Sequence, residues 1–168
     1  FETADEAIVA AKAAQKEIQP MPLEFREKII ANIRKKTLEN AKLLSELAVE
    51  ETGMGNVGHK IIKHQLVAEK TPGTEDLKTI AWSGDRGLTL TEMGPWGVIG
   101  AVCPSTNPTC TVICNSIGML AAGNAVVFMP HPSAKNCSNL AIDMVNRASV
   151  EVGGPENIVT AVAEPTMD

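Results

Sequence analysis

One short loop contains the side chain best suited to chemistry. Residues 103–108 read Cys-Pro-Ser-Thr-Asn-Pro, and the two prolines stiffen the chain around Asn107. An asparagine held in place can donate a hydrogen bond from its NH₂ group to an oxyanion that forms during a reaction. The amide suits this role because it is neutral and does not titrate. The spacing alone leaves two interpretations open: an oxyanion donor, or a structural asparagine in a turn.

The cysteines and histidines do not have the spacing of a metal site. The cysteines form no Cys-x-x-Cys pair and have no pair of histidines nearby, which argues against a zinc protein. His59 and His64 are five residues apart, too far around a helix to bind one metal well. We expect both histidines to be surface or hydrogen-bonded packing residues. We expect all the cysteines to be buried and unreactive, namely Cys103, Cys110, Cys114 and Cys137.

A series of glycines at positions 94, 97 and 100 superficially matches a dinucleotide-binding fingerprint. Such a fingerprint must follow a strand and open a helix, because its glycines let the backbone approach a pyrophosphate at the helix N-terminus. Here the glycines precede an apolar run that predicts a strand. The series is therefore interpreted as structural.

The second half of the chain alternates short apolar runs with helical segments. The runs at 98–103, 125–128 and 157–162 predict strands, of which the first two are expected to be buried on both faces. Helices are predicted at 109–121 and 134–149. This order predicts a right-handed βαβαβ unit with a parallel sheet. Ligands of such sheets bind outside the carboxyl ends of the strands, which are here the loops 104–108, 129–132 and 163–166.

The first half of the chain is predicted to be helical. Apolar spacing predicts one helix over residues 2–18 and a second that Pro22 opens. Asn40 is a suitable N-cap for a third helix, which Gly53 ends in a left-handed C-cap. A fourth helix is expected at 57–69. Turn residues at 83–87 lie between two strand-like runs and predict a β-hairpin.

The composition is that of an ordinary globular protein and excludes several function classes. The 168 residues are 44% hydrophobic and 21% charged, and the net charge of −5 offers no basic face for nucleic acid. No apolar run approaches the roughly 20 residues that a membrane helix needs. No export signal is recognisable at the start of the sequence, so the expected location is the reducing cytoplasm.

Several segments resemble the aldehyde dehydrogenase superfamily. Residues 92–100 followed by Pro-Ser-Thr-Asn-Pro at 104–108 resemble its CoA-acylating branch, whereas most of the superfamily has Pro-Trp-Asn-Phe-Pro in this loop. Residues 122–136 are similar to the same branch. So is the stretch from Glu51 to Gly55, with its continuation through Lys63, His64 and residues 68–77. The resemblance spans essentially the whole chain and is closest to acetaldehyde and propionaldehyde dehydrogenases of bacterial microcompartments.

The resemblance implies an oxidoreductase that converts a short-chain aldehyde, CoA and NAD to acyl-CoA and NADH through a cysteine thioester. It assigns the oxyanion donor to Asn107. None of the four cysteines matches the motif of the nucleophile, and Cys103 is the one most easily mistaken for it. The nucleophile is expected beyond Asp168, in a catalytic domain that the chain lacks. The chain is thus expected to be an N-terminal fragment that is inactive alone.

The resemblance also places one side of the cofactor cleft in two loops. The implied cofactor-binding residues are Cys103, Pro104, Ser105, Thr106, Met129, Pro130, His131 and Pro132. Ordinary members of the superfamily hold the adenosine ribose with a lysine and a glutamate at the second strand end, and this chain has neither. The adenosine must then be held by packing and backbone contacts, which leaves NAD and NADP as alternatives. A hypothesis follows that the Pro-His-Pro loop serves a site used alternately by NAD and CoA.

The resemblance divides the chain into three regions. These are an N-terminal helical part at 1–79, a hairpin at 80–93 that resembles the family's oligomerisation arm, and the first part of a Rossmann-like NAD-binding domain at 94–168. A homo-oligomer, dimer or tetramer, is expected because exposed strand edges are usually covered. Residence in a microcompartment with shell-protein partners is a further implication. The alternative is a non-catalytic nucleotide-binding or assembly module.

Overall fold

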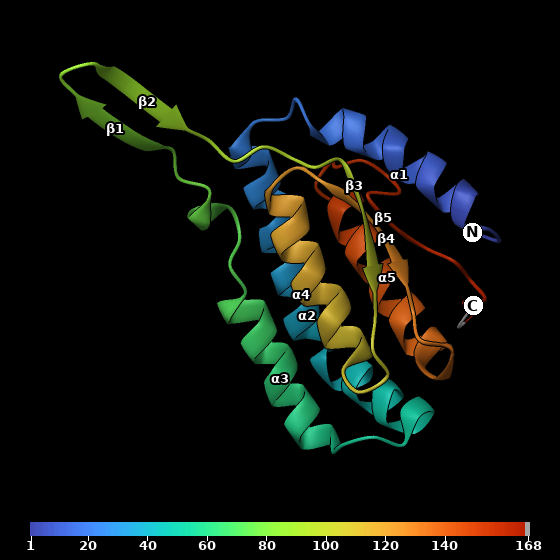
Figure 1. The fold of residues 1–168 in the computed structure, drawn as a ribbon. Helices are drawn as coiled ribbons and strands as arrows, with labels where there is room; N and C mark the ends of the chain where they lie inside the picture. Colours follow the sequence, from blue (N-terminus) through green and yellow to red (C-terminus); the bar gives the residue numbers. More distant parts are fainter. Residues whose placement is uncertain (167–168) are drawn as a thin grey trace.

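The protein is built in layers around a small parallel sheet (Figure 1). The computed structural model describes residues 1–166, so the last two residues of the predicted 94–168 region lie outside it. The helices are α1 (Ala4–Ile18), α2 (Leu23–Thr52), α3 (Val57–Lys70), α4 (Pro108–Ala121) and α5 (Lys135–Val150), with 3₁₀ turns η1 (Thr74–Asp76) and η2 (Pro132–Ala134). The strands are β1 (Ile80–Gly84), β2 (Gly87–Thr91), β3 (Val98–Val102), β4 (Ala125–Met129) and β5 (Val159–Ala161). This architecture confirms the predicted α/β class.

The sheet has the order β3-β4-β5 with all strands parallel, as the βαβαβ pattern predicts. Helix α1 packs against the three strands, α4 and α5 pack against β4 and β5 respectively, and α2 lies against both α4 and α5 (Figure 1). Strand β4 is central, and its Val126 and Phe128 are completely buried. One continuous hydrophobic cluster joins residues of α1, α2, α4, α5 and the sheet. These helices and the sheet therefore share one main core, and a small second cluster is formed by Ala48, Ala134 and Cys137.

Strand β3 differs from the prediction that it is buried on both faces. Ala101 is its one buried residue, and Val102 is 83% exposed. The reason is position, because β3 is an edge of the sheet among the described residues, whereas β4 is covered on both sides. Continuous apolar runs look alike in edge and central strands, so the sequence pattern did not separate the two.

Helix α1 begins at Ala4, two residues after the predicted start, and ends at Ile18 as predicted. The Oγ1 atom of Thr3 accepts a hydrogen bond from the Glu6 amide at 3.2 Å, and the Glu6 carboxylate accepts one from the Thr3 amide at 3.2 Å. This reciprocal pair satisfies two amides at the helix N-terminus. The inner face carries buried alanines, and Thr160 of β5 donates to the carbonyl of Ala7 at 3.3 Å. Small side chains let the helix lie close to the sheet.

The predicted second and third helices are one 30-residue helix, α2. The prediction that Asn40 caps a third helix was wrong. Its Nδ2 donates to the carbonyl of Lys36 at 2.9 Å, a contact within the turn that leaves the helix unbroken. Gly53 does end α2 as predicted, with φ of 65° in the left-handed region where glycine avoids a steric penalty.

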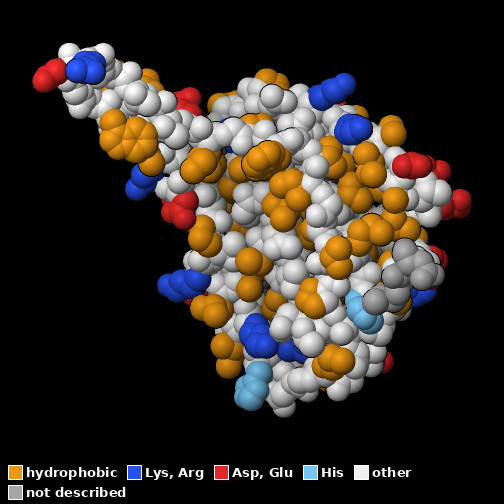
Figure 2. Space-filling model, viewed as in Figure 1, with side chains coloured by type: hydrophobic (Ala, Val, Ile, Leu, Met, Phe, Trp, Pro, Cys, Tyr) orange, Lys and Arg blue, Asp and Glu red, His pale blue; other side chains and the backbone are white. Residues whose placement is uncertain are grey.

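The predicted hairpin projects from the body as an arm formed by β1 and β2 (Figure 1). The strands pair antiparallel from Ile80 opposite Thr91 to Gly84 opposite Gly87, which leaves Asp85 and Arg86 as the two-residue turn. Every residue of both strands is exposed. Figure 2 shows apolar side chains on the surface of this arm, and its exposed large apolar residues are Ile80, Trp82, Leu88 and Leu90.

None of the helices within residues 1–166 is long and apolar enough to span a membrane.

Candidate functional site

Two of the three predicted loops lie side by side at the carboxyl edge of the sheet. Val102 at the end of β3 pairs with Met129 at the end of β4, and the Cys103 amide donates to the Met129 carbonyl at 3.0 Å. The residues that follow, Pro104 to Thr106 and Pro130 to Pro132, therefore start from adjacent points. At the third loop, the Ala163 amide donates to the carbonyl of Phe1 at 2.8 Å. The two loops that carry the candidate cofactor residues therefore lie next to each other at the carboxyl edge of the sheet.

Asn107 occupies the junction between this edge and helix α4. It is the N-cap residue, with φ −137° and ψ 58°, and Pro108 follows at the first helical position. Its side chain does not cap its own helix. Instead, its Oδ1 atom accepts a hydrogen bond from the Nζ atom of Lys63 at 3.0 Å. Within residues 1–166, no group accepts a hydrogen bond from its Nδ2, so that NH₂ group is open at the edge of the sheet.

Helix α3 holds the Asn107 loop at three points. Lys60 Nζ donates to the carbonyl of Thr106 at 3.0 Å, and Lys63 reaches Asn107 itself. His64 contacts the Oγ1 atom of Thr109 through Nε2 at 2.9 Å. The i, i+3, i+4 spacing of these α3 residues puts them on one helical face. That spacing is visible in the sequence, but it does not show what the face contacts, so Lys60 and Lys63 were not predicted as candidates.

His64 is a buried packing residue, in agreement with the prediction. Its Nδ1 atom lies 2.8 Å from the Lys60 carbonyl, which can only accept, so Nδ1 carries the proton. Ser45 Oγ also lies 3.1 Å from Nδ1. Nε2 then accepts from the Thr109 hydroxyl. Burial lowers the pKa of His64 and keeps the imidazole neutral, although the Lys60 carbonyl works in the opposite direction.

Lys60 is 4% exposed, which is unusual for a lysine. Burial lowers the pKa of its ammonium group, and the neighbouring charge of Lys63 acts in the same direction. Its hydrogen bond to the Thr106 carbonyl offsets part of the cost of burial. A buried polar group with one fixed partner gives the loop a defined position.

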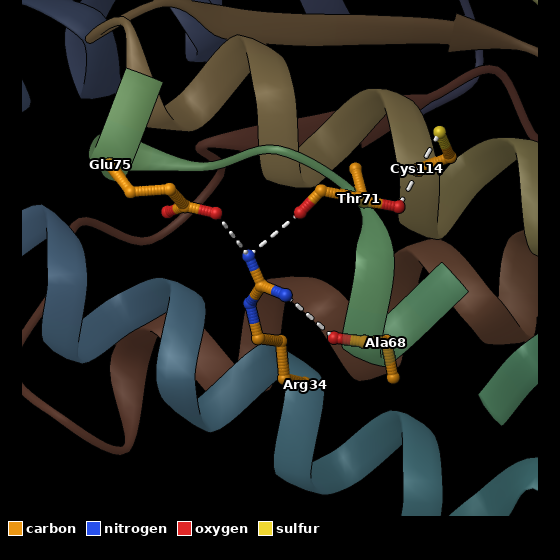
Figure 3. Close-up of polar contacts among 5 residues, drawn as sticks. All are labelled: Arg34, Ala68, Thr71, Glu75 and Cys114. Carbon is orange, nitrogen blue, oxygen red and sulfur yellow. Dashed lines mark hydrogen bonds and ion pairs between the residues drawn. The ribbon is translucent and has the colours of Figure 1, made fainter. Parts of the chain in front are cut away.

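The far end of α3 is fixed by Arg34 of α2 (Figure 3). Its guanidinium donates from Nη1 to the carbonyl of Ala68 at 2.8 Å and from Nη2 to the carbonyl of Thr71 at 2.8 Å. It also forms an ion pair with Glu75 at 3.3 Å. Thr71 in turn donates its hydroxyl to the Sγ atom of Cys114 on α4 at 3.7 Å. Both ends of α3 are therefore tied to neighbouring helices.

The N-terminus of α5, a usual place for a phosphate in a βαβ unit, is occupied by a carboxylate. Glu51 of α2 accepts hydrogen bonds from the amides of Asn136 at 2.9 Å and Cys137 at 2.7 Å. Burial acts to raise the pKa of Glu51, but the two amide hydrogen bonds outweigh it and hold the pKa below its ordinary value. These amides are consequently not available to a dinucleotide.

The Pro130-His131-Pro132 loop folds into a compact turn at the start of η2. His131 Nδ1 accepts from the Ser133 amide at 3.2 Å and contacts the Ser133 hydroxyl at 2.8 Å. The Nδ1 atom is therefore engaged within the turn, and the residue as a whole is half-buried.

The thiols have the environment of packing residues, with one exception. Burial raises the pKa of Cys103 to about 11, of Cys110 to about 11 and of Cys137 to about 12. These thiols remain protonated at neutral pH and are poor nucleophiles. The prediction that all four are buried was wrong for Cys114, which is exposed. Four residues advance a helix by about 40° beyond a full turn, which carries Cys114 past the buried face that holds Cys110.

Groups of His, Cys, Asp or Glu that could hold a metal ion are absent from the described part of the chain.

The sequence and the fold match one family throughout. The model of the aldehyde dehydrogenase family matches residues 1–167. Acetaldehyde dehydrogenase (acetylating) of Bilophila wadsworthia is 55% identical over 168 residues, which are 100% of this chain and 34% of that relative. The chain therefore spans about a third of the length of this curated relative.

Two solved structures have the same fold over this length. One is a propionaldehyde dehydrogenase from the Clostridium phytofermentans fucose utilisation bacterial microcompartment, with a TM-score of 0.97 and 64% identity. The match covers 100% of this chain and 39% of that one. The other is the Rhodopseudomonas palustris propionaldehyde dehydrogenase with bound CoA and an acylated cysteine, with a TM-score of 0.96 and 51% identity. That match covers 99% of this chain and 38% of the other.

Proposed function

This chain belongs to the aldehyde dehydrogenase family, and on that premise we propose that the full-length protein converts a short-chain aldehyde, CoA and NAD to an acyl-CoA and NADH. The acylating chemistry is supported by the 55% sequence identity, over the whole of this chain, to an acetylating relative. Within the chain, the proposal is supported by the open NH₂ group of Asn107 at the carboxyl edge of the parallel sheet. A donor at this edge lies where ligands of such sheets bind.

Asn107 acts in the first covalent step of the proposed reaction. A cysteine thiolate forms a bond to the aldehyde carbon, and the electron pair of the carbonyl π bond moves to the oxygen. The Nδ2 group of Asn107 donates a hydrogen bond to that oxyanion. The raised pKa values of Cys103, Cys110 and Cys137 disfavour these thiols as the nucleophile. Cys114 is exposed, but like the other three cysteines it does not match the motif of the family's nucleophile. We therefore place the nucleophile beyond Asp168.

The residues of the two strand-end loops fit one side of a dinucleotide. When bound, NAD accepts the hydride that leaves the aldehyde carbon, and the thiol of CoA then displaces the cysteine from the thioester. We propose that the cofactor contacts Cys103, Pro104, Ser105, Thr106, Met129, Pro130, His131 and Pro132. These loops offer packing and backbone groups without a cation. Because Glu51 occupies the α5 amides, pyrophosphate contacts have to come from elsewhere in the protein.

We assign the remaining regions in the same way. Residues 1–79 form the helical part, the arm at 80–93 mediates homo-oligomer formation, and residues 94–168 begin the NAD-binding domain. The exposed apolar side chains of the arm support its role in assembly. A place in the cytoplasm inside a bacterial microcompartment, in contact with shell proteins, is supported by the microcompartment origin of a structural relative.

An assay of NADH formation tests the proposed function. The full-length protein is mixed with NAD and a series of short aldehydes, with and without CoA. We expect continuous NADH formation with CoA and a single turnover per active site without it, because the thioester then has no acceptor. Equal steady-state rates with and without CoA would overturn the acylating assignment. The absence of NADH with every aldehyde would favour a non-catalytic module.

A further inference from the structure

A hydrogen bond between the side chains of Lys63 and Asn107 connects helix α3 to the start of helix α4. Lys63 lies on α3 and Asn107 lies 44 residues later at the start of α4, so their hydrogen bond at 3.0 Å joins two separate elements. Both helices are anchored independently of it. Lys60 and His64 bind the neighbouring residues Thr106 and Thr109 from the same face of α3.

The chemistry of this pair determines which way the amide points. A lysine ammonium group has donors only, so it can bind the Oδ1 atom of an asparagine but not the NH₂ group. With Oδ1 held by Lys63, the Nδ2 group of Asn107 must point to the other side, where no group within residues 1–166 accepts from it. A cation on Oδ1 also draws electron density through the amide, which makes Nδ2 a stronger hydrogen-bond donor.

We propose that Lys63 is a positioning residue for the oxyanion donor: it holds the Asn107 side chain in one orientation and polarises its amide. This inference rests on the proposed function, because it gives Lys63 a role in stabilising the oxyanion of the proposed reaction. Lys63 acts through Asn107 and does not itself need to touch the aldehyde. Lys60 holds the main chain of the same loop through its hydrogen bond to the Thr106 carbonyl. Lys63 holds the side chain of Asn107.

Lys63 variants of the full-length protein test the proposal. Lys63→Met removes the donors but keeps a side chain of similar length. We expect its kcat to fall about 10- to 100-fold, with little change in the KM values for aldehyde, NAD and CoA, because a misplaced donor weakens the transition state rather than substrate binding. Lys63→Arg keeps a cationic donor and should recover most of the lost rate. Lys70→Met, at the other end of α3, serves as the matched control and should keep the wild-type rate.

A double variant separates this role from a purely structural one. In an Asn107→Ala background, Lys63→Met should cause no further loss, because the amide that it positions is gone. An unchanged kcat in Lys63→Met, or an equal loss in both backgrounds, would overturn the role of Lys63. The proposed function would survive either result as long as the wild-type protein forms NADH in a CoA-dependent way. A wild-type protein that forms no NADH would overturn both proposals.

Discussion

At the scale of single residues, the side-chain amides of Asn107 and Asn124 serve different purposes because they bind different partners. Asn107 has its oxygen bound to Lys63 and its NH₂ group open, which is the arrangement of a donor that awaits a ligand. Asn124 has both ends of its amide used within the fold: its oxygen accepts from the amides of Trp96 and Gly97, and its Nδ2 donates to Met119. Only the first arrangement leaves a group for chemistry.

The buried thiol of Cys103, next to the loop of Pro104 to Thr106, provides a test of whether a cysteine of this chain is the nucleophile. Cys103→Ala in the full-length protein should keep kcat at saturating NAD within about tenfold of wild type, because a thiol with a raised pKa is not the nucleophile. The KM for NAD can rise, because Cys103 is one of the residues proposed to contact the cofactor. Steady-state NADH formation measures this directly. If the variant lost essentially all activity at saturating NAD while keeping its thermal unfolding temperature, the exclusion of Cys103 as the nucleophile would be wrong.

The sequence made Asn107 a candidate donor but did not show what holds it in place. Proline spacing and amide chemistry left a structural asparagine as the alternative, and the resemblance to the aldehyde dehydrogenase superfamily implied the donor role. Lys60 and Lys63 lie more than 40 residues earlier, on a helix whose partner is set by tertiary packing. Their spacing showed a shared face but not what that face contacts.

At the scale of secondary-structure elements, α2 is the central connection of the fold. It contacts α3, α4 and α5, and its Glu51 carboxylate caps α5 from outside the helix. A carboxylate at a helix N-terminus satisfies free amides and interacts favourably with the helix dipole. The cap therefore connects α5, and the η2 turn that directly precedes it, to the long helix α2.

Glu51 should make stability depend on pH. Glu51→Gln keeps the shape but loses the charge, so we expect the free energy of unfolding to fall by about 1–2 kcal/mol at neutral pH. The folded-state pKa of Glu51 is depressed, so its contribution is complete above the unfolded-state pKa and is lost as the pH falls through the folded-state value. The difference between wild type and variant should thus shrink below a pH of about 4.3.

Denaturant unfolding of both proteins at several pH values measures this difference. Glu46→Gln, an exposed change on the same helix whose partner is Lys42 in a surface ion pair, is the matched control and should have little effect. A Glu51→Gln difference that stays constant from neutral to acidic pH would contradict the role of the charge in capping α5.

Element types were predicted well from the sequence, whereas junctions and edges were not. The strands and helices of the βαβαβ unit follow from apolar runs separated by turn residues. Asn40 was misread as a cap because an asparagine can bond a carbonyl inside a helix as well as an amide at its start. The exposure of Val102 depends on which strands neighbour β3, and a local pattern does not contain that information.

At the scale of the whole molecule, the arm of β1 and β2 is the part whose stability the rest of the fold does not account for. Within residues 1–166 its two strands pair only with each other, and all their residues are exposed. An isolated two-stranded hairpin is at best marginally stable in water, and exposed apolar strands promote association. We therefore expect another surface to cover it in the assembled protein.

Changing the arm should change the assembly state. Replacing Trp82, Leu88 and Leu90 together with threonine keeps strand propensity but removes the apolar surface, so we expect the homo-oligomer to dissociate. Native mass spectrometry of the full-length protein measures this, with Val9→Thr on the outside of α1 as an exposed apolar control. A wild-type protein that is entirely monomeric, or a triple variant with unchanged mass, would contradict the proposed role of the arm.

We propose that Asn107 stabilises the oxyanion in an acylating aldehyde dehydrogenase, and a single-turnover measurement on the full-length protein can check this. The rate of the first NADH formed is compared between wild type, Asn107→Ala and the control Asn40→Ala, which changes an asparagine inside α2. We predict a loss of about 10²- to 10³-fold for Asn107→Ala, with aldehyde binding little changed, and a wild-type rate for the control. A rate for Asn107→Ala within about twofold of wild type would contradict the claim.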